Sequence, residues 1–182
     1  MHKLYLFFIL QLLLFHINLF SQNDNLILKS TQIKANVNVL GIGVSMENRL
    51  SKSNTLNSEI NLNFSAIYNS SQKFAYALYP GVTTEFRQYY NLNKRAKTGK
   101  NTLNNSGNFL GLTTGFLFEP LIRKDIDIQN LFVFNPAWGI QRSLSNKINF
   151  EGRLGWNFKY GLSSKNWDNT PNIRIGFGYI LK

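Results

Sequence analysis

The segment 148–160 constrains the fold most, because its apolar and polar side chains alternate almost without interruption. Its even positions are apolar apart from Gly152, and its odd positions are polar or glycine. A period of two fits a β-strand, whose successive side chains point to opposite faces, and does not fit an α-helix. In a soluble sheet the apolar face would meet the core. In an outer-membrane barrel it would meet lipid and the charged face would line a polar lumen.

The same alternation recurs along the chain and predicts seven clear strands. They cover residues 33–50, 56–68, 74–90, 109–119, 128–141, 148–160 and 173–181. Within the first of these the apolar face switches near Gly41 and Gly43, which indicates a bulge or a tight hairpin. Because outer-membrane barrels hold an even number of strands, we favour the hairpin and eight strands. The predicted fold class is all-β: an antiparallel up-and-down transmembrane β-barrel.

The segments between the strands are polar. Asn91–Asn108 is the longest, with a possible helical turn over Leu92–Ala96 and a basic cluster of Lys94, Arg95, Lys97 and Lys100. The sequence also predicts a charged turn over Pro120–Asp127 and a polar loop over Leu162–Asn172. Pro80 and Pro136 each predict an irregularity, because proline cannot donate a ladder hydrogen bond.

Residues 1–21 have the pattern of a secretory signal peptide. Lys3 is followed by an apolar run from Leu4 to Phe20 and then by the small residue Ser21. A retained membrane helix is the alternative, but polar interruptions and the lack of a basic flank argue against it. The remaining residues, 22–182, are about the length that one eight-stranded barrel domain requires.

Cleavage after Ser21 would leave no histidine or cysteine, because both histidines of the chain, His2 and His16, lie in the signal and the chain has no cysteine. The inventory then excludes Ser-His-Asp and Cys-His nucleophiles, a histidine general base, a zinc site of His and Cys ligands, and disulfides. We therefore expect no enzymatic activity and no cofactor or metal. Catalysis by carboxylates alone, from Glu85 and Glu151, is the remaining enzymatic alternative, but carboxylates beside arginines are more often structural.

The non-aromatic faces of four predicted strands carry a balanced set of charges. These luminal ion-pair candidates are Glu59, Glu85, Arg87, Glu151, Arg153 and Arg174. The lumen of an eight-stranded barrel is just wide enough for side chains, so three acids and three arginines could brace it as ion pairs. Alternatively, they face water on the outside of a soluble sheet.

Aromatic side chains gather near the predicted strand ends, where the interfacial girdles of a membrane barrel would lie. They are Tyr68, Phe74, Tyr90, Phe118, Phe132, Phe158, Tyr160 and Tyr179. Without Lys3 the chain holds nineteen Lys and Arg against nine Asp and Glu. This charge suits the phosphate-rich lipids of an outer membrane, lipopolysaccharide included, or an anionic polysaccharide, whereas export makes nucleic acid the weakest candidate.

Three stretches together carry a resemblance that covers nearly the whole chain: the signal at residues 1–21, the segment from Pro80 to Tyr90 leading into 104–112, and the final strand. The chain resembles a family of small, uncharacterised outer-membrane β-barrel proteins of Gram-negative bacteria. The resemblance implies insertion by the outer-membrane assembly machinery and a periplasmic C-terminus. Enzymatic barrels of this membrane, the lipid A acyltransferase and deacylase, use a histidine with a serine, and residues 22–182 offer no histidine.

The final strand also looks like the insertion signal of such barrels. Arg174 and Gly176 would face the lumen, while Tyr179 and Leu181 would face lipid. Leu181 replaces the usual terminal aromatic residue, and Lys182 follows it.

Two questions of function and topology stay open in the sequence. The leading hypothesis is a non-enzymatic outer-membrane barrel that contacts envelope lipids, polysaccharide or a partner protein. A narrow channel for small solutes and a soluble, secreted, lipocalin-like binder are the alternatives. The length of the loop 91–108 favours the extracellular side, but counting back from a periplasmic C-terminus places it in the periplasm. We follow the count.

Overall fold

Nine antiparallel strands account for most of the computed structural model, which describes residues 27–68 and 74–182. The predicted signal peptide therefore lies outside the described residues. The strands are β1 (Thr31–Asn38), β2 (Gly41–Arg49), β3 (Asn54–Ile67), β4 (Ala75–Tyr89), β5 (Asn108–Leu117), β6 (Ile122–Lys124), β7 (Leu131–Ser143), β8 (Ile148–Gly161) and β9 (Trp167–Ile180). A short helix α2 (Leu92–Lys97) and a 3-10 turn η1 (Leu103–Asn105) lie between β4 and β5.

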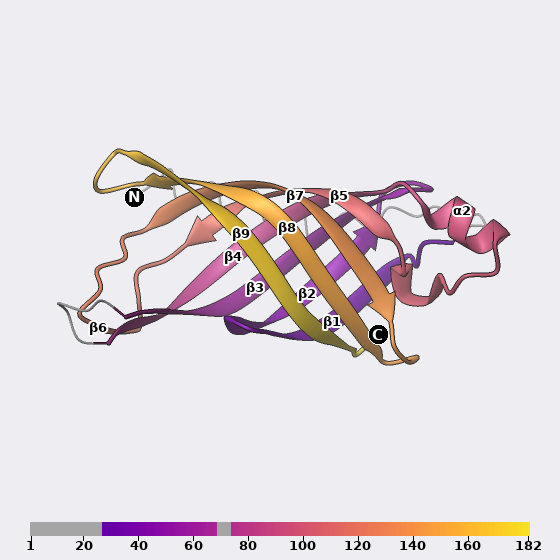
Figure 1. Cartoon of the computed structure of the whole chain (residues 1–182), viewed down its shortest axis with the longest axis horizontal. Coiled ribbons are helices and arrows are strands. Elements are labelled where there is room, and N and C mark those ends of the chain that lie inside the picture. Colours follow the sequence, from indigo (N-terminus) through magenta and orange to yellow (C-terminus); the bar gives the residue numbers. More distant parts are fainter. Residues whose placement is uncertain (1–26, 69–73) are drawn as a thin grey trace.

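Eight of these strands close into a barrel, as the sequence predicts. Each of them pairs with its neighbours in chain order, and β1 pairs with β9 to complete the ring. The ninth strand, β6, pairs only with the first residues of β4, Tyr76 to Leu78 (Figure 1).

The switch of face near Gly41 is the tight hairpin between β1 and β2. Gly41 has a φ of 155°, which L-residues rarely adopt, and a Cβ there would overlap the carbonyl oxygen of Leu62 on β3. Glycine is therefore required at the turn. The hairpin adds the eighth strand and reverses which alternate positions face inward.

The two prolines mark breaks in the ladders, as expected. On β4, pairing with β5 ends at Gly81 and pairing with β6 begins at Leu78, so Pro80 lies where the partner changes. On β7, the ladder with β8 omits Asn135 and Pro136. A missing amide hydrogen is tolerated at both places because no regular ladder bond is required there.

Two segments differ from the sequence prediction, and the predicted helical turn is confirmed as α2. The segment 167–172 is the first part of β9 and not loop, because it pairs with β8 from Tyr160–Trp167 onward. The predicted turn 120–127 contains β6. Neither segment alternates between apolar and polar residues, so only pairing with a neighbouring strand identifies it as strand.

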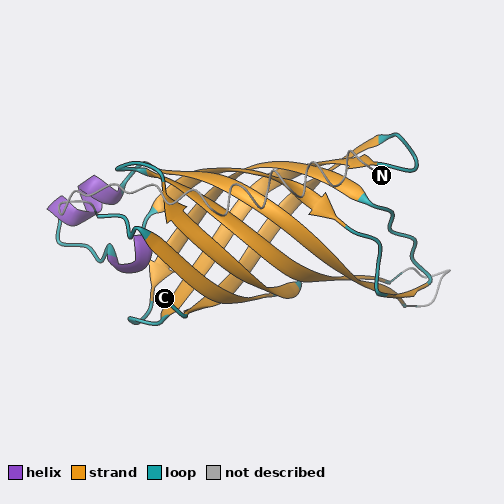
Figure 2. Ribbon diagram, turned by 180° about the vertical axis from the view of Figure 1, so that it is seen from behind, coloured by secondary structure: helices purple, strands orange, loops and turns teal. Residues whose placement is uncertain are grey.

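The barrel has two different ends. The terminal end holds the start of β1, the C-terminus and the connections 50–53, 91–107 and 144–147. The far end holds the end of β3, the start of β4 and the connections 118–130 and 162–166. Figure 1 shows α2 and the C-terminus at the same end, and Figure 2 shows the same arrangement from behind. The count of strands therefore places the basic loop 91–108 beside the C-terminus, as we expected.

The polarity of the barrel is inverted relative to a soluble protein. Among the described residues, twenty buried side chains are polar or charged and nine are hydrophobic, whereas thirty-one large hydrophobic side chains are exposed. In the described ranges 27–68 and 74–182, no helix is long and apolar enough to cross a bilayer.

Candidate functional site

Strand alternation points all six predicted luminal charges into the barrel. Glu59 lies on β3, Glu85 and Arg87 on β4, Glu151 and Arg153 on β8, and Arg174 on β9. Four of the six side chains are at most 7% exposed, and every one of the six forms an ion pair with a residue on the lumen side. Because alternation points these side chains inward and the ring closes, residues more than one hundred positions apart, such as Glu59 and Arg174, meet in the lumen.

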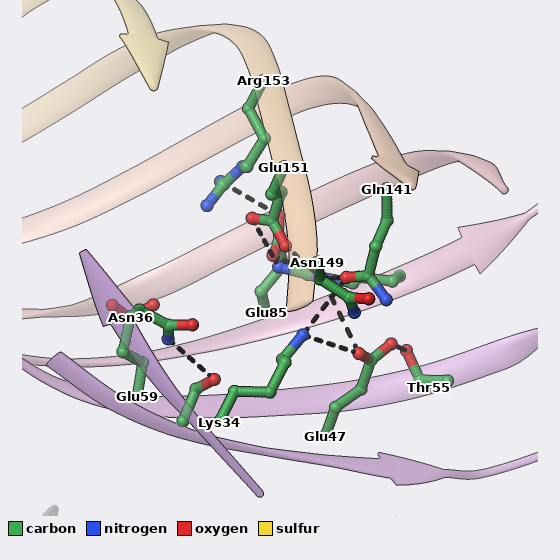
Figure 3. Close-up of polar contacts among 12 residues, drawn as sticks. Lys34, Asn36, Glu47, Thr55, Glu59, Glu85, Gln141, Asn149, Glu151 and Arg153 are labelled. Atoms are coloured by element: carbon green, nitrogen blue, oxygen red, sulfur yellow. Dashed lines mark hydrogen bonds and ion pairs between the residues drawn. The ribbon is translucent and has the colours of Figure 1, made fainter. Parts of the chain in front are cut away.

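Arg87 is the centre of the network. Its guanidinium binds Glu151 through two hydrogen bonds of 2.9 and 3.0 Å, and its Nε donates to Glu85 at 2.6 Å. The Glu47 carboxylate lies 3.9 Å away, and the Phe109 ring packs 4.5 Å from the guanidinium carbon. One fully buried arginine thus crosses the lumen between β4 and β8. Figure 3 shows Glu47 and Glu151 among the polar side chains that meet inside the barrel.

Lys34 and Glu47 complete the network, and the sequence did not reveal them. Lys34 Nζ lies 3.1 Å from Glu47 and 3.1 Å from the amide oxygen of Gln141. Thr55 and Tyr89 donate hydroxyl hydrogen bonds to the same Glu47 carboxylate. The hairpin between β1 and β2 hid this pair, because the inward positions are even-numbered at Lys34 before it and odd-numbered at Glu47 after it. Along β1, the polar residues Gln32, Lys34, Asn36 and Asn38 do alternate.

The remaining two ion pairs lie closer to the far end. Arg153 Nη2 is 3.0 Å from Glu85 and also donates to Thr113 at 2.8 Å. Arg174 pairs with Glu59 at 2.5 Å and donates to Asn38. With these pairs the network contains four carboxylates and four cations, all pointing into the lumen.

Side chains also fill the lumen at the terminal end. Leu28, Tyr89, Leu92 and Phe109 form a buried apolar cluster beneath α2. Gln141 fixes the loop above it, because its amide donates to the Asn104 carbonyl at 2.7 Å. The loop 91–108 is therefore a folded plug. Its lysines project outward, since Lys94, Lys97 and Lys100 are exposed and Arg95 is only half-buried.

At the far end the lumen is open instead. A cavity of about 510 Å³ is lined by small polar side chains such as Asn61, Asn135 and Asn157, by an apolar wall, and by the cations Arg153, Lys159 and Arg174. Below the Arg174–Glu59 pair, only about 10 Å³ of space remains among the buried charges. The cavity is thus blind, and the ion pairs form its floor.

The other predicted residues lie on the outer face or at its edges. Of the terminal-strand residues, Gly176 is buried inside the wall, while Tyr179 and Leu181 are exposed outside it. Six of the predicted girdle aromatics lie towards the far end, and Tyr90 and Tyr179 lie towards the terminal end. Tyr160 packs on Trp167 with ring centroids 5.2 Å apart, so aromatic side chains cluster at the far ends of β8 and β9.

Comparisons with protein-family models, with curated proteins and with solved structures found no match for this chain. Within residues 27–68 and 74–182, no group of three or more His, Cys, Asp or Glu side chains is arranged to hold a metal ion. The described site offers ion pairs, amides and hydroxyls.

Proposed function

We propose that this protein is a non-enzymatic β-barrel of the outer membrane of a Gram-negative bacterium, with a blocked lumen and an outer face in contact with lipid. The observation that carries the proposal is the inverted polarity of the wall. A soluble barrel of this size fills its interior with apolar side chains, whereas a membrane barrel does the reverse.

The outer face supports this choice over a soluble lipocalin-like binder. Leu154, Ile173, Phe177 and Ile60 are between 52 and 65% exposed, and they belong to a belt that runs around the barrel. Contiguous apolar surface of this extent is rare on soluble monomers, because it costs free energy in water and promotes association. A bilayer removes that cost.

The closed lumen supports a non-conducting barrel over a narrow channel. An ion entering from the far end would meet the Arg174–Glu59 pair, then the charges around Arg87, and then the plug of Tyr89 and Phe109. Glu59, Arg87, Tyr89 and Phe109 are buried, and Arg174 is partly buried and held by Glu59 and Asn38. Continuous passage would require the whole network to rearrange.

Orientation and partners follow from the same proposal. With a periplasmic C-terminus, the plug and its basic cluster face the periplasm and the cavity opens towards the cell surface. The partners are then outer-membrane lipids, including lipopolysaccharide, and the assembly machinery that reads the Tyr179 strand. A protein partner has no specific support in the described residues.

Fractionation and electrophoresis test the proposal. We expect the protein to be extracted from cell envelopes only by detergent, and to migrate differently on gels with and without boiling. We also expect no conductance steps in planar bilayers. Release as a soluble protein would contradict the membrane assignment, and stable conductance would replace the blocked barrel with a channel.

A further inference from the structure

One side of the barrel wall is incomplete at the far end. The strands β1 and β2 contain eight and nine residues, whereas β3, β4, β8 and β9 contain fourteen or fifteen. The hairpin between β1 and β2 consequently turns back well short of the end that the β8–β9 connection reaches (Figure 1). Its last hydrogen bonds to the neighbouring strands are Val39 N to Ile175 O and Leu40 O to Phe64 N.

Beyond those bonds the facing edges of β3 and β9 have no strand between them in the described part of the chain. The open edge of β9 comprises residues 167–174, which at about 3.3 Å per residue is roughly 26 Å of strand. We call this gap the notch. Pro171 lies on this edge, where the absence of an amide hydrogen leaves one donor fewer to satisfy.

The cavity passes through the notch. Its lining includes inward side chains, such as those of Asn135 and Arg153, and also outward residues of the wall, such as Leu40, Phe64 and Ile173. These outward residues belong to the tip of the β1–β2 hairpin and to the strands β3 and β9 on either side of it, so the same residues border the cavity and the notch. The notch is therefore a lateral opening between the lumen and the surroundings of the barrel.

The notch lies at the depth of the apolar belt. Its rim residues Val39, Leu40 and Ile173 are 78, 57 and 65% exposed, and the contacting rings of Tyr160 and Trp167 lie above it, at the far end of the strands. Open strand edges in hydrocarbon are tolerated only where they line a water-filled cavity, because each unpaired amide there is costly. The cavity behind this notch has a polar lining and opens at the far end, so water can reach the unpaired edge.

The cavity combines an apolar wall with a cationic floor. Leu117, Val133 and Ile128 line it on the side of β5 and β7, which lie across the ring from the β1–β2 hairpin. Its charged lining consists of Arg153, Lys159 and Arg174 with the carboxylate of Glu59. Glu59 pairs with Arg174, and Glu85 beneath the lining pairs with Arg153, which leaves one positive charge in excess.

Lys159 is the free cation of this lining. Arg153 and Arg174 have carboxylate partners, but among the described residues Lys159 forms no ion pair. Asp168 stands opposite it in the β8–β9 register without pairing and does not line the cavity.

We propose that the notch and the cavity together form a binding site for a single-chain anionic amphiphile, a fatty acid in its simplest form, that enters sideways from the membrane. The carboxylate meets Lys159 and the floor arginines, and the acyl chain lies between the apolar wall and the notch rim. The volume of about 510 Å³ is in the range of small-ligand sites. This inference rests on the proposed membrane location.

Photolabelling distinguishes a bound chain from ordinary bilayer contact. The purified protein is reconstituted in phosphatidylcholine vesicles with palmitic acid that carries a diazirine in mid-chain, and the labelled residues are mapped by mass spectrometry. We expect labels on Leu117 and Val133, which face the lumen, as well as on Val39 and Ile173. Excess palmitate should remove the lumen labels. Labels confined to outward-facing residues would overturn the proposal.

Two competitors identify the source of the ligand. Competition by palmitate alone indicates a free fatty acid, and competition by oleoyl lysophosphatidylglycerol indicates a membrane lysophospholipid with the same combination of one anionic headgroup and one acyl chain. Either result supports the site. Lumen labels that neither competitor removes would overturn it.

A matched pair of variants tests the headgroup assignment. Lys159→Gln should reduce lumen labelling about fivefold at limiting probe, the effect of losing one charged contact. Lys124→Gln removes the same charge at the same end, outside the cavity lining, and should leave labelling unchanged. Equal labelling in both variants would refute the assignment. Heat-modifiable gel mobility, measured in parallel, reports whether the barrel is inserted. If the barrel is inserted but carries no lumen labels, only this inference is wrong. If the protein is soluble, the proposed function is wrong as well.

Discussion

Six strands, β3, β4, β5, β7, β8 and β9, run along both halves of the lumen, and the two halves differ in what those strands place inside. Towards the terminal end the inward positions hold Arg87, Tyr89, Phe109 and Gln141, all at most 2% exposed. Towards the far end they hold short side chains, including Asn61, Thr113 and Asn157, around the 510 Å³ cavity. Side-chain size at inward positions, on a common backbone, thus determines whether a barrel of eight strands is filled or hollow.

Glycine contributes to the filled half as well. A Cβ at Gly139 would overlap the ring of Phe109, and a Cβ at Gly111 would overlap the Glu85 carboxylate. The wall is thin at these positions so that long side chains from the neighbouring strands fit. The filled half is a packed polar core, and the hollow half is an open chamber with a polar lining.

The difference between the filled and the hollow half should be largest in the loss of stability when a central charge is removed. Arg87→Leu leaves Glu151 without its two hydrogen bonds and removes one partner each from Glu85 and Glu47. We expect the free energy of unfolding to fall by about 3–5 kcal/mol, because uncompensated buried charge remains. Urea unfolding in detergent micelles, followed by tryptophan fluorescence, measures this change. An unchanged midpoint would mean that the filled half is hydrated like the hollow one.

The outer wall provides the next contrast, since both halves share one apolar belt. Leu154→Arg, near the middle of β8, should lower stability by about 2–4 kcal/mol if the belt is in lipid. Tyr160→Arg, six residues nearer the far end of the same strand, should cost much less because the side chain reaches the interface. The same unfolding experiment in lipid vesicles compares them, and equal small losses would favour a soluble barrel.

Sequence reasoning predicted the strands and six of the eight charges because alternation is a local signal that fixes which face each side chain occupies. It missed Lys34 and Glu47, because the two-residue hairpin between them reverses which alternate positions face inward. It also missed the strand at 167–172, because apolar and polar residues do not alternate there. The cavity and the notch could not be predicted at all. They depend on the unequal lengths of β1 and β9 and on which strands become neighbours when the ring closes.

The ion-pair geometry sharpens the expectation for Arg153, which the sequence treats as equivalent to Arg87. Its partner Glu85 keeps a second hydrogen bond from Arg87 at 2.6 Å, so Arg153→Leu leaves no carboxylate wholly unpaired. We expect a loss of about 2–3 kcal/mol, smaller than for Arg87→Leu, because Thr113 and Asn135 lose a donor as well. Calorimetry on both variants in one detergent ranks them. A larger loss for Arg153→Leu would shift the centre of the network towards the far end.

The smallest expected effects compare two amide side chains, one from each half. Gln141 accepts hydrogen bonds from Lys34 at 3.1 Å and Arg87 at 3.2 Å and donates to the Asn104 carbonyl, with no exposed surface. Gln141→Leu keeps most of the volume but leaves these groups unsatisfied, so we expect a loss of about 1–2 kcal/mol.

Asn157, by contrast, is half-buried beside the cavity and accepts one hydrogen bond, from Asn135 at 2.9 Å. Water in the cavity can replace that acceptor, so Asn157→Leu should change stability by less than about 0.5 kcal/mol. Parallel urea titrations of the two leucine variants test the contrast, since both remove an amide from a lumen-facing position. A loss at Asn157 as large as at Gln141 would show that the hollow half excludes water, because only a dry chamber makes an unpaired Asn135 amide costly.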